Sequence, residues 1–100
     1  MIYDKQKWQR KRAAILRRDK YMCQESLRYG KRVPADTVHH IFPVESYPEY
    51  QWESWNLISL CKAQHNAMHV RGTHELSVKG KELMERTMRK GYPPINPVGR

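Results

Sequence analysis

Apolar residues recur at helical spacing in two segments of this chain. Over residues 6–19, Trp8, Ile15 and Leu16 fall on one face of a helix, so the arginines of the same segment lie on the outside. Residues 79–90 show the same period and predict a second helix. The inner stripe of this second helix consists of Leu83, Met84, Thr87 and Met88.

Between these helices the pattern changes to short apolar runs that are typical of strands. Residues 37–43 are rich in β-branched side chains and stop at a proline, and residues 56–60 form a second apolar run. An aromatic segment, 44–55, connects them, and a loop of this length in a small domain is often functional. A further helix is predicted over 61–70, whereas 24–36 is interpreted as a loop or loose hairpin arm. The middle of the chain is therefore strand, long loop, strand, helix.

Five polar residues lie within these apolar or helical segments. His39 and His40 are in the first predicted strand, and Asn56 begins the second. His65 and His69 are four residues apart, so they share one face of the predicted helix. Two imidazoles from a helix and one from a strand provide three nitrogen ligands around an open metal position, which a hydrolytic metal needs. The other strand histidine is then free to act as a base, so a nuclease-like site is predicted.

The chain is small and strongly basic. Its 100 residues carry a formal net charge of +9, with a sequence pI of about 9.8. Because the excess charge recurs along the whole chain, we expect a polyanionic partner, although the densest basic block, residues 5–12, would also suit a solvated helix face. No apolar run approaches the length of a membrane span, so no membrane role is expected.

The N-terminal segment and the cysteines indicate the compartment. The chain turns polar at once, without the apolar stretch of a signal peptide, and it contains only Cys23 and Cys61. The reducing cytoplasm is therefore the expected location. We predict one domain over residues 1–92 with its core at 37–72, followed by a flexible tail over 93–100.

The order of these elements and residues resembles the HNH endonuclease family, above all its small phage-type members. The resemblance spans roughly residues 8–72. It implies an α+β fold with a ββα-metal (His-Me finger) core, in which a two-stranded antiparallel hairpin and a helix are flanked by N-terminal and C-terminal helices. The residues that carry it are Trp8, Arg12, Leu16 to Asp19, Cys23, Val38 to Ile41, Pro43, Asn56, Leu57, Leu60, Cys61, His65, Asn66 and His69.

The resemblance also implies a role for each polar residue. His39, His65 and His69 would hold one divalent metal ion, with Mg, Mn, Ni and Zn all open. His40 would be the general base, because an imidazole with an unperturbed pKa of about 6.5 is mostly a neutral acceptor at neutral pH. Asn56 would hydrogen-bond across the hairpin and hold the loop and His40 in position.

The expected substrate is double-stranded DNA, hydrolysed with low sequence specificity to 5′-phosphate and 3′-hydroxyl ends. Contacts to phosphates position a protein on DNA without specifying sequence. Small phage members of the family often assist genome packaging, so a terminase partner and the cytoplasm of a bacterial host are also implied. The residues expected to contact DNA are Arg10, Arg12, Arg17, Arg18 and Arg71.

The chain departs from the family pattern at a second, structural metal site. Many members hold a zinc ion with two Cys-x-x-Cys pairs, but here Ser26 takes the second place after Cys23, and Gln64 takes it after Cys61. A structural zinc is therefore not expected, although the two cysteines should lie close together. Packing must replace the metal, and the candidate core residues are Trp8, Ile15, Leu16, Tyr21, Trp55, Leu57, Ile58 and Leu60.

Other interpretations of the same residues stay open. One member of an adjacent histidine pair in a strand can simply be a buried, hydrogen-bonded side chain. His69 also suits the end of a helix, where the dipole favours a positive charge, and Asn56 also suits a turn. His74 and the glutamates of the 44–55 segment are expected to take no part.

An alternative function is a non-catalytic, metal-stabilised DNA-binding module. Cys61, His65 and His69 are spaced at four-residue intervals, and Cys23 could complete a closed tetrahedral site. Such a site would leave both strand histidines without a role. A toxin nuclease domain is a third option, but we would expect such a domain within a much longer chain.

Overall fold

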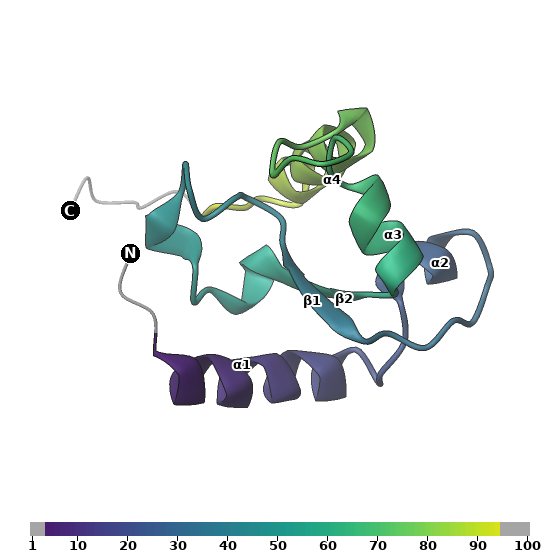
Figure 1. Ribbon diagram of the computed structural model, residues 1–100, viewed down its shortest axis with the longest axis horizontal. Coiled ribbons are helices and arrows are strands. Elements are labelled where there is room, and N and C mark those ends of the chain that lie inside the picture. The colour runs from purple at the N-terminus through teal and green to yellow at the C-terminus, as the bar shows by residue number, and fades with distance from the viewer. Residues whose placement is uncertain (1–3, 95–100) are drawn as a thin grey trace.

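The computed structural model of the protein describes residues 4–94 (Figure 1). Within this range no helix is both long and apolar enough to cross a membrane. The predicted tail over 93–100 lies mostly outside the described residues, and the domain bounds stay a prediction. The elements in chain order are α1 (Lys5–Arg18), α2 (Gln24–Arg28), β1 (Thr37–His40), two short 3-10 helices (Pro48–Tyr50 and Ser54–Asn56), β2 (Leu57–Leu60), α3 (Lys62–Ala67) and α4 (Val78–Arg89).

The two strands form an antiparallel hairpin at the centre of the fold. Thr37 pairs with Leu60 and His40 pairs with Leu57, which fixes the register. Because side chains alternate along a strand, His39 and His40 point to opposite faces of the hairpin. His39 is almost completely buried, with 2% of its surface exposed, whereas His40 is half-buried.

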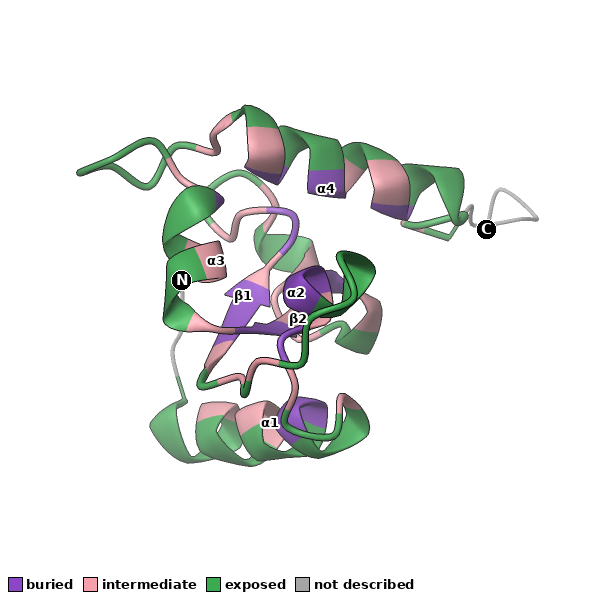
Figure 2. Ribbon diagram, turned by 90° about the vertical axis from the view of Figure 1, so that its right-hand side faces the viewer, coloured by how far each residue is buried: buried purple, intermediate pink, exposed green. Residues whose placement is uncertain are grey.

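Helix α1 lies along one side of the hairpin, and α4 lies on the other side (Figure 2). Asp4 caps α1 by accepting a hydrogen bond from the Lys7 amide at 2.9 Å. At the other end, Asp19 Oδ2 accepts a hydrogen bond from the amide of Ser59 in β2 at 3.0 Å. The apolar face of α1 closes a first core cluster, which consists of Ile15, Leu16, Val38 and Leu57, with Trp8 packed against it.

A second core cluster joins the hairpin to α3 and α4. Its buried members are Cys23, Ile41, Phe42, Leu60, Met68 and Leu83. Most of the predicted core residues are confirmed, because they belong to one of the two clusters or pack against it. These confirmed residues are Trp8, Ile15, Leu16, Trp55, Leu57, Ile58 and Leu60.

Two predicted core positions are wrong, because Tyr21 is 54% exposed and Met88 is 48% exposed. The chain leaves α1 through positive φ angles at Lys20 and Tyr21, which ends the helical period before Tyr21. Met88 lies off the face of α4 that carries the buried Leu83 and Thr87. Both side chains therefore point away from the core.

Residues 24–36, predicted as a loop or hairpin arm, contain the short helix α2. Its five residues are too few to show a period in the sequence. Glu25 on this helix is 1% exposed and accepts hydrogen bonds from Arg28 at 3.0 Å and from Arg86 of α4 at 2.9 Å. Lys79 Nζ lies 3.8 Å from the same carboxylate. These ion pairs join α2 to α4.

The residues of the two incomplete Cys-x-x-Cys pairs lie together. Ser26 Oγ donates a hydrogen bond to Cys23 Sγ at 3.3 Å and lies 4.0 Å from Cys61 Sγ. Both thiols are free in the described structure. Gln64 Oε1 accepts a hydrogen bond from Lys79 Nζ at 2.7 Å. The two cysteines therefore lie near one another, as the sequence predicted, among hydrogen-bonded side chains.

The first turn of α4 packs tightly against the end of α3 at Gly80. A Cβ atom at this position would collide with the carbonyl oxygen of Met68 and with the side chain of Leu76. We expect Gly80→Ala to lower the free energy of unfolding by about 1–3 kcal/mol, although alanine by itself favours a helix. Urea unfolding measures the change, and Lys81→Ala at the exposed neighbouring position is the control. Equal stability of Gly80→Ala and the wild type would contradict this contact.

Candidate active site

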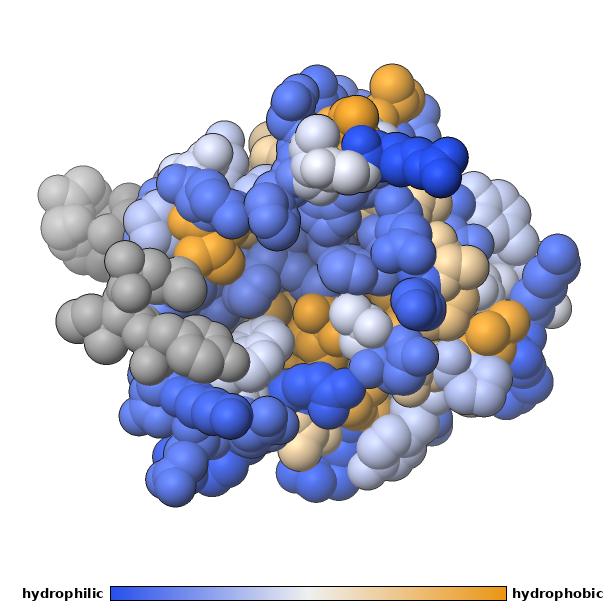
Figure 3. Space-filling model, in the orientation of Figure 1, coloured by the Kyte–Doolittle hydropathy of each residue, from blue (hydrophilic) through white to orange (hydrophobic). Residues whose placement is uncertain are grey.

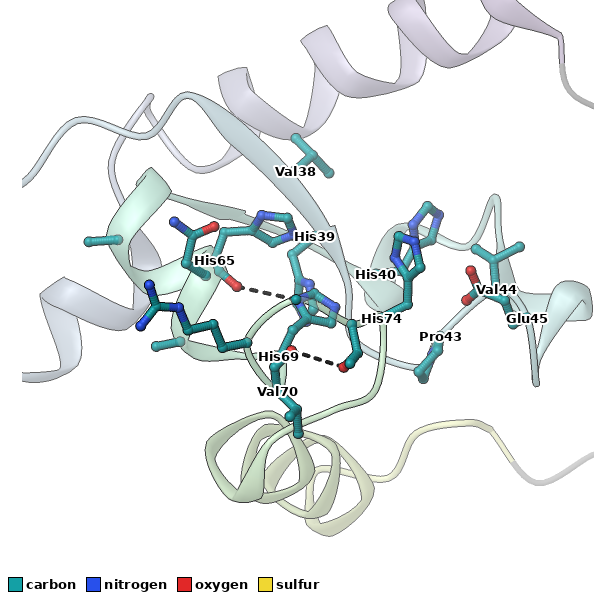
Figure 4. Close-up of a pocket in the computed structure, with 16 residues that line it drawn as sticks. Val38, His39, His40, Pro43, Val44, Glu45, His65, His69, Val70 and His74 are labelled. Atoms are coloured by element: carbon teal, nitrogen blue, oxygen red, sulfur yellow. Dashed lines mark hydrogen bonds between the residues drawn. The ribbon is translucent and has the colours of Figure 1, made fainter.

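Three histidine rings from β1 and the α3 region converge on one point (Figure 4). The His39 ring lies 5.3 Å, between centroids, from the rings of both His65 and His69, and it meets both edge-on. The rings of His65 and His69 are 5.1 Å apart. His39 Nε2 is buried and has no hydrogen-bond partner among the described residues. A buried polar atom of this kind is costly unless another group binds it.

The end of α3 places the two histidines that follow β2. His65 lies in the last turn of α3, but α3 ends at Ala67 with Met68 as its cap, so His69 lies just past the helix rather than inside it as predicted. The His69 amide donates to the Asn66 carbonyl at 3.3 Å, which keeps the turn tight and keeps His69 beside His65. His69 Nδ1 lies 3.4 Å from the His65 carbonyl oxygen; because a carbonyl can only accept, Nδ1 is the donor, which leaves Nε2 as the ring nitrogen available to a metal.

The chemistry of these three side chains fits a divalent metal ion. One ring nitrogen from each of His39, His65 and His69 lies within 4.8 Å of the other two. Burial, reinforced by the neighbouring histidines, lowers the pKa of His39 to about 3. Burial also lowers the pKa of His65, with His69 adding to the effect. His39 and His65 therefore present neutral nitrogens, and a set of three imidazole ligands leaves open positions for water or substrate.

Neither cysteine belongs to this group of histidines in the described part of the chain. Among residues 4–94, the three histidines are the one set of three or more potential ligands close enough to share an ion. Cys61 instead lies near Ser26, at the opposite end of α3 from His69. The closed site of Cys23, Cys61, His65 and His69, on which the binding-module alternative was based, is therefore wrong.

His40 points to the other face of β1 and is held by the loop between the strands. Its Nε2 lies 3.1 Å from the carbonyl oxygen of Gln51. Because a carbonyl can only accept, Nε2 carries the proton and Nδ1 keeps a lone pair. Burial lowers the pKa of His40, although the Gln51 hydrogen bond and the charge of Glu45 act in the opposite direction. Besides the Gln51 carbonyl, the indole of Trp8 contacts the His40 ring by stacking on it.

Asn56 ties the two ends of that loop together. Its side chain is fully buried; Oδ1 accepts from the Phe42 amide at 2.7 Å, and Nδ2 donates to the carbonyls of Phe42 at 3.2 Å and Tyr50 at 3.1 Å. These are the hydrogen bonds across the hairpin that the sequence predicted. They hold the segment that carries Gln51, and Gln51 in turn holds His40.

Comparison with known proteins identifies the family. No protein-family model and no curated protein matches the chain. A solved structure does match it, the crystal structure of the HNH endonuclease of the deep-sea thermophilic bacteriophage GVE2 with a manganese ion. The identity is 32% over 84% of this chain and 76% of that chain, with a TM-score of 0.58. This chain belongs to the HNH endonuclease family.

The HNH endonucleases are phosphodiester hydrolases, so the predicted family and enzyme class are confirmed. The α+β fold class is confirmed as well, because the antiparallel hairpin of β1 and β2 is followed by α3 and flanked by α1 and α4. The match does not assign roles to single residues of this chain.

A pocket of about 770 Å³ opens beside the histidines of this HNH endonuclease. Besides the strand and α3 histidines, Glu45 and His74 line the pocket, although the sequence suggested no part for either of them. His74 reaches it because the turn after His69 folds back, with the Val70 amide donating to the Glu75 carbonyl at 2.8 Å. Gly72 was the sequence signal for that turn, because its φ of 78° is a conformation that glycine adopts without steric cost.

The five predicted DNA-binding arginines fall into two groups. Arg10 and Arg17 are exposed on α1, and Arg71 is exposed at the pocket. Arg12 and Arg18 instead also serve the fold: Arg12 donates to the Asp36 carbonyl at 2.6 Å, and Arg18 donates to the Leu57 carbonyl at 2.7 Å. The face shown in Figure 3 is mostly hydrophilic, including the part over α1.

Proposed function

We propose that this HNH endonuclease hydrolyses double-stranded DNA with one divalent metal ion held by His39, His65 and His69. The observation that carries the proposal is the convergence of three imidazoles around a buried nitrogen that has no partner among the described residues. A divalent ion bound there would stabilise the negative charge that develops on the scissile phosphate. Manganese is the first metal to test, because the related phage enzyme contains it.

His40 is the proposed general base. With Nε2–H fixed on the Gln51 carbonyl, Nδ1 is free to take a proton from a water molecule. The water oxygen forms a bond to phosphorus while the bond from phosphorus to O3′ breaks; His40 holds the proton lost by the water, and the departing O3′ takes up a proton from solvent. The products carry 5′-phosphate and 3′-hydroxyl ends. Asn56 serves this step by holding the loop that positions His40.

The proposed DNA contacts are electrostatic. The formal charge of +9 and the exposed Arg10, Arg17 and Arg71 favour phosphate binding, with Arg12 and Arg18 adding positive charge while they hold α1. Contacts of this kind support low sequence specificity. A terminase partner, a role in genome packaging and a cytoplasmic location stay predictions from the resemblance to phage enzymes.

Removal of the metal is expected to abolish cleavage. Chelator-treated protein should leave supercoiled plasmid intact, and Mn²⁺ should restore conversion to the open-circular form. His65→Ala should weaken Mn²⁺ binding by at least about 10²-fold, because loss of a ligand costs no less than loss of a residue that supports one. Titration calorimetry measures the affinity, and plasmid nicking at increasing Mn²⁺ measures the activity.

Cys61→Ser is the control for this experiment, because Cys61 lies outside the histidine group. This variant should bind Mn²⁺ and nick DNA like the wild type. A wild type that binds DNA but cleaves it with none of Mg²⁺, Mn²⁺, Ni²⁺ or Zn²⁺ would contradict the proposed activity and favour a binding module.

A further inference from the structure

An aromatic side chain from α1 covers one face of the His40 ring. The centroids of the Trp8 and His40 rings are 5.3 Å apart and their planes differ by 20°, which is an offset stack. Trp8 belongs to the N-terminal helix, whereas His40 ends β1, so the contact forms only in the folded chain. Although His39 and His40 leave β1 on alternate faces, both line the same pocket, together with His65 and His69.

Two contacts together fix the orientation of the His40 imidazole. The Gln51 carbonyl sets the direction of Nε2, at 3.1 Å, and the indole of Trp8 sets the plane of the ring. A hydrogen bond alone allows the ring to tilt about the bond, and a stack alone allows it to rotate within its plane. With both contacts in place, Nδ1 has one direction in which to accept a proton.

Trp8 is itself held rigidly. It packs against the core cluster of Ile15, Leu16, Val38 and Leu57. Trp52, from the loop between the strands, also lies near the Trp8 indole, with ring centroids 6.3 Å apart and planes at 56°. Lys7 Nζ lies 4.3 Å above the ring of Trp52 and adds a cation–π contact. These contacts hold the indole of Trp8 in one orientation, so it can in turn restrict the orientation of His40.

We propose that Trp8 is a positioning residue for DNA hydrolysis, because its indole holds the general base His40 in the orientation that proton transfer requires. This inference rests on the proposed function. Helix α1 then has two roles, because it carries the exposed Arg10 and Arg17 and also the indole that stacks on His40. Trp8 lies outside both the histidine group and the lining of the pocket, so its proposed role is to act through His40.

A pair of substitutions separates stacking from simple filling of space. Trp8→Leu keeps an apolar side chain against the core cluster but removes the flat ring, whereas Trp8→Phe keeps a ring that can stack. In Mn²⁺-supported cleavage, we expect Trp8→Leu to lower kcat by about 10- to 100-fold, since misplaced catalytic groups cost rates of this order. KM should stay within about twofold, and Trp8→Phe should retain kcat within about threefold of the wild type.

A spectroscopic signature reports the contact without any reaction. The ring current of an indole stacked on His40 should shift the carbon-bound ring protons of His40 upfield in a proton–carbon NMR spectrum recorded without paramagnetic metal. The signals are assigned by their absence in His40→Ala. The upfield shift should disappear in Trp8→Leu and persist in reduced form in Trp8→Phe.

Each result supports or overturns the inference. A low kcat and a lost upfield shift in Trp8→Leu, both rescued in Trp8→Phe at similar unfolding temperatures, support it. If the wild type is active and Trp8→Leu has the same kcat, the role of Trp8 is overturned while the proposed function stands. The same holds if the upfield shift of the His40 protons is unchanged in Trp8→Leu. Losses of activity that follow stability equally in both variants indicate a structural role only. An inactive wild type overturns the proposed function and this role with it.

Discussion

Replacement of His40 by alanine is expected to reduce the rate of DNA cleavage by about 10²–10⁴-fold, the range that a general base contributes. The loss follows from the geometry: Nε2 is fixed on the Gln51 carbonyl, and Nδ1 is the acceptor left for the proton of water. Metal binding should persist, because the side chain of His40 points to the opposite face of β1 from His39. DNA affinity should stay within about twofold, since the lost interaction belongs to the reaction step.

Single-turnover nicking of supercoiled plasmid, with enzyme in excess and Mn²⁺ saturating, measures this rate. Titration calorimetry with Mn²⁺ and DNA binding in the presence of a chelator are the parallel controls. Added imidazole should restore part of the activity, because it can occupy the space that the side chain leaves. Cleavage by His40→Ala at the rate of the wild type would show that another group accepts the proton.

Replacement of Glu25 by glutamine is expected to lower the free energy of unfolding by about 2–4 kcal/mol. The carboxylate is 1% exposed and faces Arg28 at 3.0 Å, Arg86 at 2.9 Å and Lys79 at 3.8 Å, so glutamine would leave three cations around a neutral group. Removal of one partner of a fully buried pair costs about 3–5 kcal/mol. The expected loss is smaller here, because the three cationic side chains are 22–45% exposed and water can partly solvate them.

Urea unfolding at constant m value measures the loss, and Glu85→Gln on the exposed face of α4 is the matched control. The control should change the stability by no more than about 0.5 kcal/mol. A Glu25→Gln variant as stable as its control would mean that the ion pairs between α2 and α4 contribute nothing to the fold.

The sequence predicted the features that depend on neighbouring residues. The apolar period of 6–19 and 79–90 located α1 and α4 to within about one residue at each end, because a helical face is a local pattern. The two strands and their order were predicted for the same reason. Helix α2 was missed, because its five residues carry no period and the ion pairs of Glu25 join it to a helix distant in the chain.

The candidate ligands could also be predicted from the sequence, because histidines in otherwise apolar segments are rare and chemically distinctive. The spacing of His65 and His69 placed both beside His39, although His69 lies past the end of α3. The sequence offered a second set with Cys61, and only the tertiary structure shows that this thiol lies away from the histidines. The spacing of residues along a helix predicts which side chains share a face, but it does not predict which part of the folded chain that face will contact.

The sequence by itself thus determined the elements, the family resemblance, the basic charge and the set of polar residues available for chemistry. The tertiary structure alone decided how those residues are used. It gave Arg12 and Arg18 backbone partners, brought Glu45 and His74 to the pocket, and set Trp8 against His40. The physical reason is that periodicity and propensity act between near neighbours, whereas stacking, burial and ion pairs join residues that meet only after the chain has packed.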